Sequence, residues 1–262
     1  MNINIQGKYA LVCGSTQGIG RAIAEELAIL GANIILLARN EDKLQEVLAI
    51  LENNQGQTHA YIVADFAEPE FLKRSIEAYL STQPTVHILV NNTGGPPAGP
   101  ILTSNLEAFT QAFSNHLLCN HILAQAVIPG MKKEGYGRII NVISTSVKQP
   151  LPGLGVSNTI RGAVANWAKT LATEVAPHGI TVNNVLPGAT NTTRLQAIFD
   201  NKSAKTGKTN AEVQAEMLAE IPAARFANPS EIAYAVAFLA TPAAAYINGI
   251  NVPVDGGRTL SL

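Results

Sequence analysis

Short apolar runs rich in β-branched residues alternate with longer helical patterns along the chain, and this alternation constrains the fold more than any other feature. The runs are continuously apolar rather than strictly alternating, which is typical of strands buried on both faces of a parallel sheet. Repeated strand–helix units of this kind predict a doubly wound parallel α/β sheet of about seven strands, with helices on both faces. The predicted strands are 9–13, 33–38, 60–64, 86–90, 138–143, 180–186 and 250–254, and the helices between them include 19–31, 40–53 and 161–176.

Length and composition limit the classes of protein that remain. The 262 residues suit a single domain, 1–262, better than two smaller ones. A net charge of −1 gives no electrostatic footprint for nucleic acid or acidic lipid. The sequence shows no secretion signal, no apolar run of membrane-spanning length and only two cysteines, so we expect a cytoplasmic protein with no membrane partner.

One polar stretch, 190–212, interrupts the strand–helix pattern between two well-formed units. A linker is one interpretation, but no second domain follows it. We therefore interpret the segment 190–220 as a mobile flap over a ligand site, because long polar loops in compact domains are commonly lids.

Three glycines follow the first predicted strand directly and lead into a helix. Gly14, Gly18 and Gly20 have the spacing that allows a tight turn and a close backbone approach to a pyrophosphate at the helix N-terminus. Glycines in a strand–helix turn can also be purely structural. Their position between a buried strand and a long helix favours a dinucleotide-binding loop, and with it a Rossmann-type sheet.

Six motifs in order resemble those of the short-chain dehydrogenase/reductase family, and the resemblance extends along essentially the whole chain. They are the glycine motif 14–20, an adenine-contacting Asp65, the sequence Asn-Asn-Thr-Gly at 91–94, Ser144 after the fifth strand, Pro187-Gly188 followed by Thr192 in the segment that lies against the nicotinamide carboxamide, and a last-strand motif at 246–257. The last motif is similar to that of the 3-oxoacyl-acyl-carrier-protein reductase branch. The resemblance implies a nicotinamide cofactor and no metal. These motifs, together with Arg39 after the second strand, give the predicted set of cofactor-binding residues. They are Gly14, Ser15, Thr16, Gln17, Gly18, Ile19, Gly20, Arg39, Asp65, Phe66, Asn91, Thr93, Gly94, Arg161, Pro187, Gly188 and Thr192.

The end of the second predicted strand indicates the type of cofactor. An NAD(H) enzyme usually carries an acidic residue there, which bonds the ribose 2′-hydroxyl. This chain has Ala38 and then Arg39, whose guanidinium can bind a 2′-phosphate. The alternative is that Arg39 only begins the next helix in solvent. We predict that NADP(H) is preferred over NAD(H).

The four active-site positions that the resemblance implies depart from the family pattern at three places. The family has Asn, Ser, Tyr and Lys, and ungapped counting places His116, Ser144, Ser157 and Arg161 there. A serine hydroxyl is a far weaker acid than a tyrosine phenol, and an arginine does not release a proton at neutral pH. Other candidate proton donors are His116, Lys148 and a water between Ser144 and Ser157. His116 could equally be a structural histidine, and Lys148 a solvated loop residue.

Two interpretations from different classes therefore stay open. One is an NADP(H)-dependent oxidoreductase that reduces a small-molecule carbonyl or acyl thioester, such as a 3-oxoacyl thioester or another ketone, through a non-standard proton path. The other is an NADP(H)-binding protein without turnover, a sensor or an assembly subunit. We favour the enzyme, because Ser157 and Arg161 form an organised pair one helical turn apart. Docking of acyl carrier protein would favour a basic rim, for which the loose candidates are Lys202, Lys205 and Lys208.

The predicted helices at 104–129 and 157–176 carry apolar residues on more than one face. A helix that is apolar on two faces needs a partner beyond its own sheet. The family also pairs these two helices between subunits, so we predict a homotetramer or homodimer. The apolar residues concerned include Leu117, Leu118, Ile122, Val164, Trp167 and Leu171.

Overall fold

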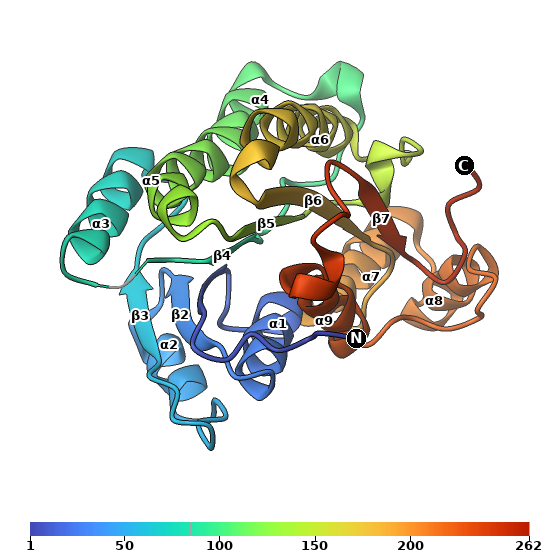
Figure 1. Ribbon diagram of the computed structural model, residues 1–262. Coiled ribbons are helices and arrows are strands. Elements are labelled where there is room, and N and C mark those ends of the chain that lie inside the picture. Colours follow the sequence, from blue (N-terminus) through green and yellow to red (C-terminus); the bar gives the residue numbers. More distant parts are fainter. Residues whose placement is uncertain (84, 262) are drawn as a thin grey trace.

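A parallel sheet of seven strands, in the order β3-β2-β1-β4-β5-β6-β7, runs through the part of the chain that the structure describes (Figure 1). This computed structural model describes residues 1–83 and 85–261. The strand order reverses between β1 and β4, and ligands of such sheets bind at that point, beyond the carboxyl ends of the strands. The predicted doubly wound sheet is confirmed. Its strands are β1 (Tyr9–Cys13), β2 (Asn33–Ala38), β3 (Ala60–Val63), β4 (Ile88–Asn91), β5 (Gly137–Val142), β6 (Ile180–Pro187) and β7 (Asn251–Val254).

Helices cover both faces of the sheet (Figure 1). Helices α3 to α6 lie on the upper face in that view, α1, α2 and α9 lie on the lower face, and α7 and α8 lie near β7. The helices are α1 (Gly18–Ile29), α2 (Glu41–Leu48), α3 (Pro69–Thr82), α4 (Leu106–Phe113), α5 (Cys119–Glu134), α6 (Gly155–Val175), α7 (Thr193–Thr206), α8 (Asn210–Ala219) and α9 (Pro229–Ala240).

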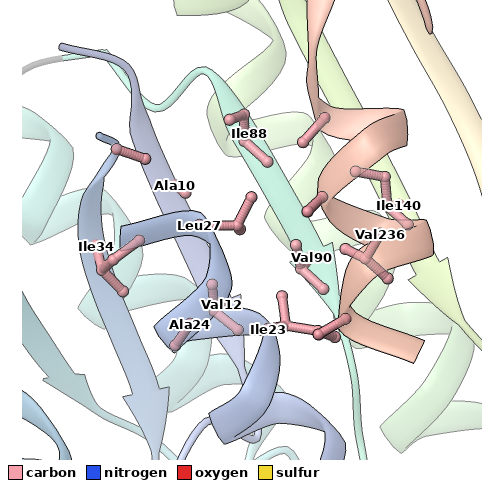
Figure 2. Packing of buried hydrophobic residues seen from close by; sticks show 14 of the residues in the cluster. Ala10, Val12, Ile23, Ala24, Leu27, Ile34, Ile88, Val90, Ile140 and Val236 are labelled. Atoms are coloured by element: carbon pink, nitrogen blue, oxygen red, sulfur yellow. The ribbon is translucent and has the colours of Figure 1, made fainter. Parts of the chain in front are cut away.

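The core on one face holds α1 against the sheet (Figure 2). Ile23 and Leu27 lie four residues apart on one side of α1, where side chains at that spacing are neighbours. They share a fully buried aliphatic cluster with Val12 of β1, Val90 of β4 and Val236 of α9. This packing fixes the N-terminus of α1, and therefore the glycine loop before it, relative to the strand ends.

Predicted and observed strands agree to within two residues at each end. The helix predicted at 40–53 is shorter, because α2 ends at Leu48 and a turn containing Gly56, at φ +79°, leads towards β3. The helix predicted at 104–129 is present as a continuous helical segment over 106–134, but it is not regular. A π-helical turn at Ser114–Leu118 separates α4 from α5, and such a turn inserts one extra residue that a simple helical periodicity does not reveal.

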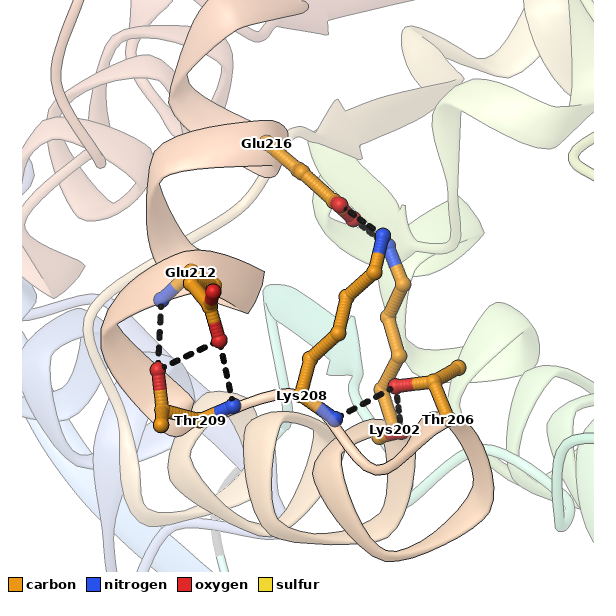
Figure 3. A network of polar contacts seen from close by, with 6 residues as sticks. All are labelled: Lys202, Thr206, Lys208, Thr209, Glu212 and Glu216. Atoms are coloured by element: carbon orange, nitrogen blue, oxygen red, sulfur yellow. Dashed lines mark hydrogen bonds and ion pairs between the residues drawn. The ribbon is translucent and has the colours of Figure 1, made fainter.

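The segment 190–220 is largely helical, although its polar composition indicated a flap. Thr209 and Glu212 form a capping box at the start of α8, in which each side chain accepts from the other residue's backbone N–H. Lys202 and Lys208 both pair with Glu216, which ties α7 to α8 (Figure 3). The polar residues thus hold two helices together, and the single Glu216 carboxylate offsets one of the two positive charges that these predicted rim lysines carry. The mobility of this segment stays a prediction.

A row of asparagine side chains crosses the sheet from β4 to β7. Asn91 donates to Asn141 (2.8 Å), Asn141 donates to Asn184 (2.9 Å), and Asn184 donates to Asn251 (2.8 Å). The four residues are paired in register, and the first three are buried. Buried amides with partners stabilise a unique register. The side chain of Asn91 therefore points along the sheet.

Part of the apolar surface predicted on the helices at 104–129 and 157–176 is accessible in the single chain, with Leu118 of the π-helical turn 40% exposed. Val164 does not belong to that surface, because it is fully buried with Ile143 and Leu186 in the chain's own core. Across residues 1–83 and 85–261, the structure contains no helix with both the length and the apolar character needed to cross a bilayer.

Candidate cofactor and active site

A groove of about 400 Å³ lies at the carboxyl ends of β1 to β4, where the strand order reverses. Its walls come from the loops that follow these four strands and from the start of α7. Most of the predicted cofactor-binding residues lie in it, but Ser15, Gly20, Asn91, Arg161, Pro187 and Gly188 do not. The lining residues are Gly14, Thr16, Gln17, Gly18, Ile19, Leu37, Ala38, Arg39, Ala64, Asp65, Phe66, Asn92, Thr93, Gly94, Asn115, Thr192, Thr193 and Arg194.

The glycine loop has no room for side chains at two of its positions. Gly14 has φ +61°, and a Cβ there would collide with the backbone carbonyl of Asn92. A Cβ at Gly20 would collide with the Gly14 carbonyl oxygen and would lie 2.6 Å from Nδ2 of Asn92. The loop is also tied to β2, because Oγ of the buried Ser15 accepts from the Leu37 N–H (3.1 Å). Ser15 therefore positions the loop and does not face the groove.

The N-terminus of α1 opens into the groove without a side-chain cap. Gln17 precedes it in an extended conformation, makes no capping bond, and no acidic residue occupies the first turn. Uncapped first-turn N–H groups carry a partial positive charge and are suited to a phosphate. Thr192 lies across the loop, because a Cβ at Gly18 would be 3.2 Å from its Cγ2.

The ends of β2 and β3 present Arg39 and Asp65 to the same groove. The Arg39 side chain is 80% exposed, and its Nη1 lies 3.7 Å from Oδ2 of Asp65. An exposed pair at this distance contributes little stability. The guanidinium can therefore turn towards an anion at low energetic cost, and no carboxylate occupies the position at Ala38.

Arg161 lies outside the groove lining but contacts Thr93, which lines the groove, and this region is the proposed reaction end. Ser157 and Arg161 lie one turn apart on α6 and are both buried. Arg161 donates through Nη1 to the Val142 carbonyl (3.1 Å) and through Nη2 to the Thr93 carbonyl (3.4 Å), and thus bridges the ends of β5 and β4. Ser144 follows β5 directly, and its Oγ accepts from the Ser146 N–H (3.1 Å). The Ser157 hydroxyl forms no hydrogen bond with the described residues.

His116 lies in the π-helical turn, at the side of Arg161. Its Nδ1 is 2.6 Å from Oγ1 of Thr93, and the residue is 3% exposed. Burial, followed by the charges of Arg161 and Arg194, lowers its pKa to about 3. His116 is consequently neutral near pH 7, where it can accept or donate a hydrogen bond but is not available as an imidazolium acid.

Arg194 belongs to the site, although sequence reasoning missed it. It sits in the first turn of α7, lines the groove, and donates through Nη1 to the Gly95 carbonyl (3.1 Å). The contact joins positions 99 residues apart, so only the fold reveals it. The sequence Thr192-Thr193-Arg194 could have revealed Arg194 as a site residue, because the segment after Pro187 was already expected at the nicotinamide.

Two of the predicted residues shape the wall behind the groove. Gly188 donates its N–H to the Val254 carbonyl (2.9 Å), and a Cβ there would meet Cα of Asp255 at 2.7 Å. Pro187 is the last residue of β6. Lys148 ends the 3₁₀ turn Thr145–Val147 and is outside the set of groove residues.

The low pKa of His116 predicts a pH-dependent stability. The unfolded chain protonates this histidine near its ordinary pKa of about 6.5, whereas the folded chain resists protonation down to about pH 3. The unfolded state therefore binds more protons in this window, and stability falls as the pH is lowered through it. Between pH 7.5 and 4.5, we expect wild type to lose about 2–3 kcal/mol more than His116→Asn.

Urea denaturation at a series of pH values measures this difference. His178→Asn, at an exposed position, is the matched control and should keep the wild-type slope. Equal acid losses in wild type and His116→Asn would contradict the placement of His116 beside two cations.

Comparisons with known proteins agree with this geometry. Residues 14–259 match the family model described as enoyl-(acyl carrier protein) reductase. The chain is 37% identical over 257 residues to the 3-oxoacyl-[acyl-carrier-protein] reductase FabG of Vibrio cholerae, covering 97% of this chain and 98% of that protein. Among solved structures, it is similar to L-sorbose reductase from Gluconobacter frateurii complexed with NADPH and L-sorbose (33% identity, TM-score 0.93, both chains covered completely). YwfH, an NADPH-dependent reductase involved in bacilysin biosynthesis, is also similar (28% identity, TM-score 0.91, covering 97% of this chain and 99% of that one).

Proposed function

The chain belongs to the short-chain dehydrogenase/reductase family, and from that premise we propose that it is an NADP(H)-dependent enzyme that reduces a carbonyl through a non-standard proton path. The observation that carries the proposal is the buried Arg161, bound to the ends of two strands one helical turn from an unpartnered Ser157 hydroxyl. A 3-oxoacyl thioester or another ketone is the proposed substrate class.

The groove fits a nicotinamide dinucleotide. The tight contacts around Gly14 and Gly20 form a cradle that a Cβ would fill, and the uncapped N-terminus of α1 beside it suits the pyrophosphate. Asp65 and Phe66 would hold the adenine end, and Thr192 would close over the loop. The bound cofactor supplies the hydride, and the remaining chemistry belongs to this chain's residues.

Arg39 is proposed to select NADP(H) over NAD(H). Its exposed guanidinium stands where a carboxylate would otherwise bond the ribose. Arg39→Ala should weaken NADPH binding by about 1–3 kcal/mol, as expected for a lost charge-assisted hydrogen bond, and should leave NADH affinity nearly unchanged. Calorimetry with both cofactors measures this, with Lys43→Ala on α2 as an exposed control. Equal wild-type affinities for NADPH and NADH would contradict the proposed selection of NADP(H) by Arg39.

The reaction end can polarise a carbonyl without a strong acid. In this proposal the hydroxyls of Ser144 and Ser157 donate hydrogen bonds to the carbonyl oxygen, while Arg161 holds the nicotinamide ribose. As hydride reaches the carbonyl carbon, the oxygen gains negative charge and takes a proton from one of these hydroxyls. We propose that water re-protonates the serine hydroxyls, since His116 is neutral at this pH. In this proposal the serine hydroxyls and Arg161 orient and polarise the substrate, and water relays the proton. The reaction therefore needs no strongly acidic side chain.

A screen for NADPH oxidation tests the proposal. The purified protein is first shown to bind NADPH and is then offered ketones, 3-oxoacyl thioesters and quinones. We expect carbonyl-dependent oxidation of NADPH with at least one class. Tight binding without turnover of any carbonyl would support the non-catalytic sensor or assembly subunit instead.

We also propose that the protein is a homotetramer or homodimer. Leu102, Leu106 and Leu118, in and beside α4 and the π-helical turn, are 40–93% exposed in the single chain, and apolar surface of this kind is covered in oligomers. Light scattering at micromolar concentration should give two or four times the 27.6 kDa chain mass. A monomeric mass would count decisively against it.

A further inference from the structure

Two guanidinium groups from different helices converge at the reaction end of the groove. The position that a Cβ at Gly95 would take lies 2.8 Å from Nη2 of Arg194 and 3.6 Å from Nη2 of Arg161. Arg161 comes from α6 and Arg194 from α7, so the fold brings two positive charges to one corner.

No carboxylate compensates these charges. Within residues 1–83 and 85–261, neither arginine forms an ion pair, and their hydrogen bonds go to the backbone carbonyls of Val142, Thr93 and Gly95. Nε of Arg161 is buried and has no hydrogen-bond partner. A buried cation without a counter-charge is costly, so such a corner is suited to an anion that arrives with a ligand.

His116 also faces this corner. Burial, with the charges of the same two arginines added, keeps it neutral, and the lowered pKa of Arg161, about 10, still leaves that side chain charged near pH 7. Burial is the larger cause of both shifts, and repulsion between positive charges at short range adds to it. An anion bound here would relieve that repulsion.

We propose that Arg194 binds a carboxylate of the substrate beside the positive charge of Arg161, which narrows the proposed carbonyl substrates to those that also carry a carboxylate, the oxo acids. The proposal rests on the proposed reductase function and names its substrate class. The proposed site of the cofactor's phosphates, at the glycine loop and Arg39, is separate, whereas Arg161 at this corner lies one helical turn from Ser157, the proposed polarising group. The fork of Arg194 matches a carboxylate's paired oxygens.

Matched acid and ester substrates test the proposal. Acetoacetate and methyl acetoacetate carry the same ketone, but only the first carries a charge. We expect wild type to show a KM for acetoacetate at least tenfold below that for the ester. Arg194→Gln should raise the KM for the acid at least tenfold and change that for the ester less than twofold, while Arg194→Lys should restore part of the difference. Arg194 is exposed at the groove rim, so these variants should fold.

Lys133→Gln is the control, because it removes a positive charge from the exposed end of α5, which leads into the amino end of β5. It should leave both KM values unchanged. A wild type that does not distinguish acid from ester would overturn the proposal. So would an Arg194→Gln variant that weakens NADPH binding and leaves the acid-to-ester ratio unchanged, because the charges would then serve the cofactor.

A binding measurement separates this proposal from the proposed function. Calorimetric titration of the NADP⁺-saturated protein with acetoacetate and with its methyl ester needs no turnover. Tighter binding of the acid that is lost in Arg194→Gln supports the anion site even if no carbonyl is reduced. Equal binding of acid and ester, alongside measurable NADPH oxidation, rejects the anion site and leaves the reductase standing.

Discussion

Replacement of Gly20 by alanine is expected to remove measurable cofactor binding. The added Cβ would meet the Gly14 backbone carbonyl and the Asn92 side-chain amide, which is held in place by hydrogen bonds to the carbonyls of Cys13 and Gly14. The glycine loop must therefore shift, and at least two N–H groups lose their alignment with the pyrophosphate. Two charge-assisted hydrogen bonds are worth about 3 kcal/mol or more, so NADPH affinity should fall about 100-fold or more.

Gly162→Ala is the matched control for this substitution. It also adds one methyl group to a helix, but nothing lies within 4 Å of the new Cβ. Alanine there should preserve NADPH affinity and raise stability slightly, because glycine is unfavourable inside a helix. Calorimetry and thermal denaturation of both variants check the expectation. Unchanged NADPH affinity in Gly20→Ala would mean that the cofactor does not lie on this loop.

Replacement of Ser157 by alanine is expected to lower kcat about 10- to 1000-fold, the range for losing one oxyanion-type donor. The hydroxyl has no partner among the described residues, so its removal should not destabilise the fold, and NADPH affinity should persist. Arg161→Ala should instead reduce both NADPH affinity and rate, because that side chain would hold the ribose and joins the ends of β4 and β5. Intact rates in both variants would refute the assignment of this pair.

The double change Ser157→Tyr with Arg161→Lys restores the family's residues and discriminates the two interpretations. In an enzyme with its own proton path, the phenol would crowd an occupied pocket and lower NADPH oxidation. In a nucleotide-binding protein that has only lost its acid, the same change should create reductase activity where none existed. Wild type and double variant are compared on one carbonyl panel.

Much of the fold was predictable, because burial on both faces of a parallel sheet leaves uninterrupted apolar runs. The runs at 33–38 and 180–186 coincide with β2 and β6 almost residue for residue. The glycine motif and Arg39 were also predictable, since local chain geometry and charge decide what such positions can hold. Their lining of one groove agrees with that prediction.

The electrostatics of the reaction end could not be read from the sequence. The unperturbed pKa of His116 made it the best candidate acid, but two arginines and burial hold it neutral. That environment depends on Arg194, which reaches Gly95 across 99 residues of chain. Likewise, the in-register row that holds the Asn91 side chain requires strand alignment, which no local pattern encodes.

Transfer of deuterium from NADPH labelled at the nicotinamide C4 position tests the central claim most directly. The labelled cofactor is incubated with the protein and the carbonyl panel, and the products are analysed by mass spectrometry. Reduction in the site described here predicts one deuterium on the carbinol carbon of a product, formed about 10- to 1000-fold more slowly by Ser157→Ala. Tight NADPH binding with no deuterium in any product, or equal transfer by Ser157→Ala, would contradict it.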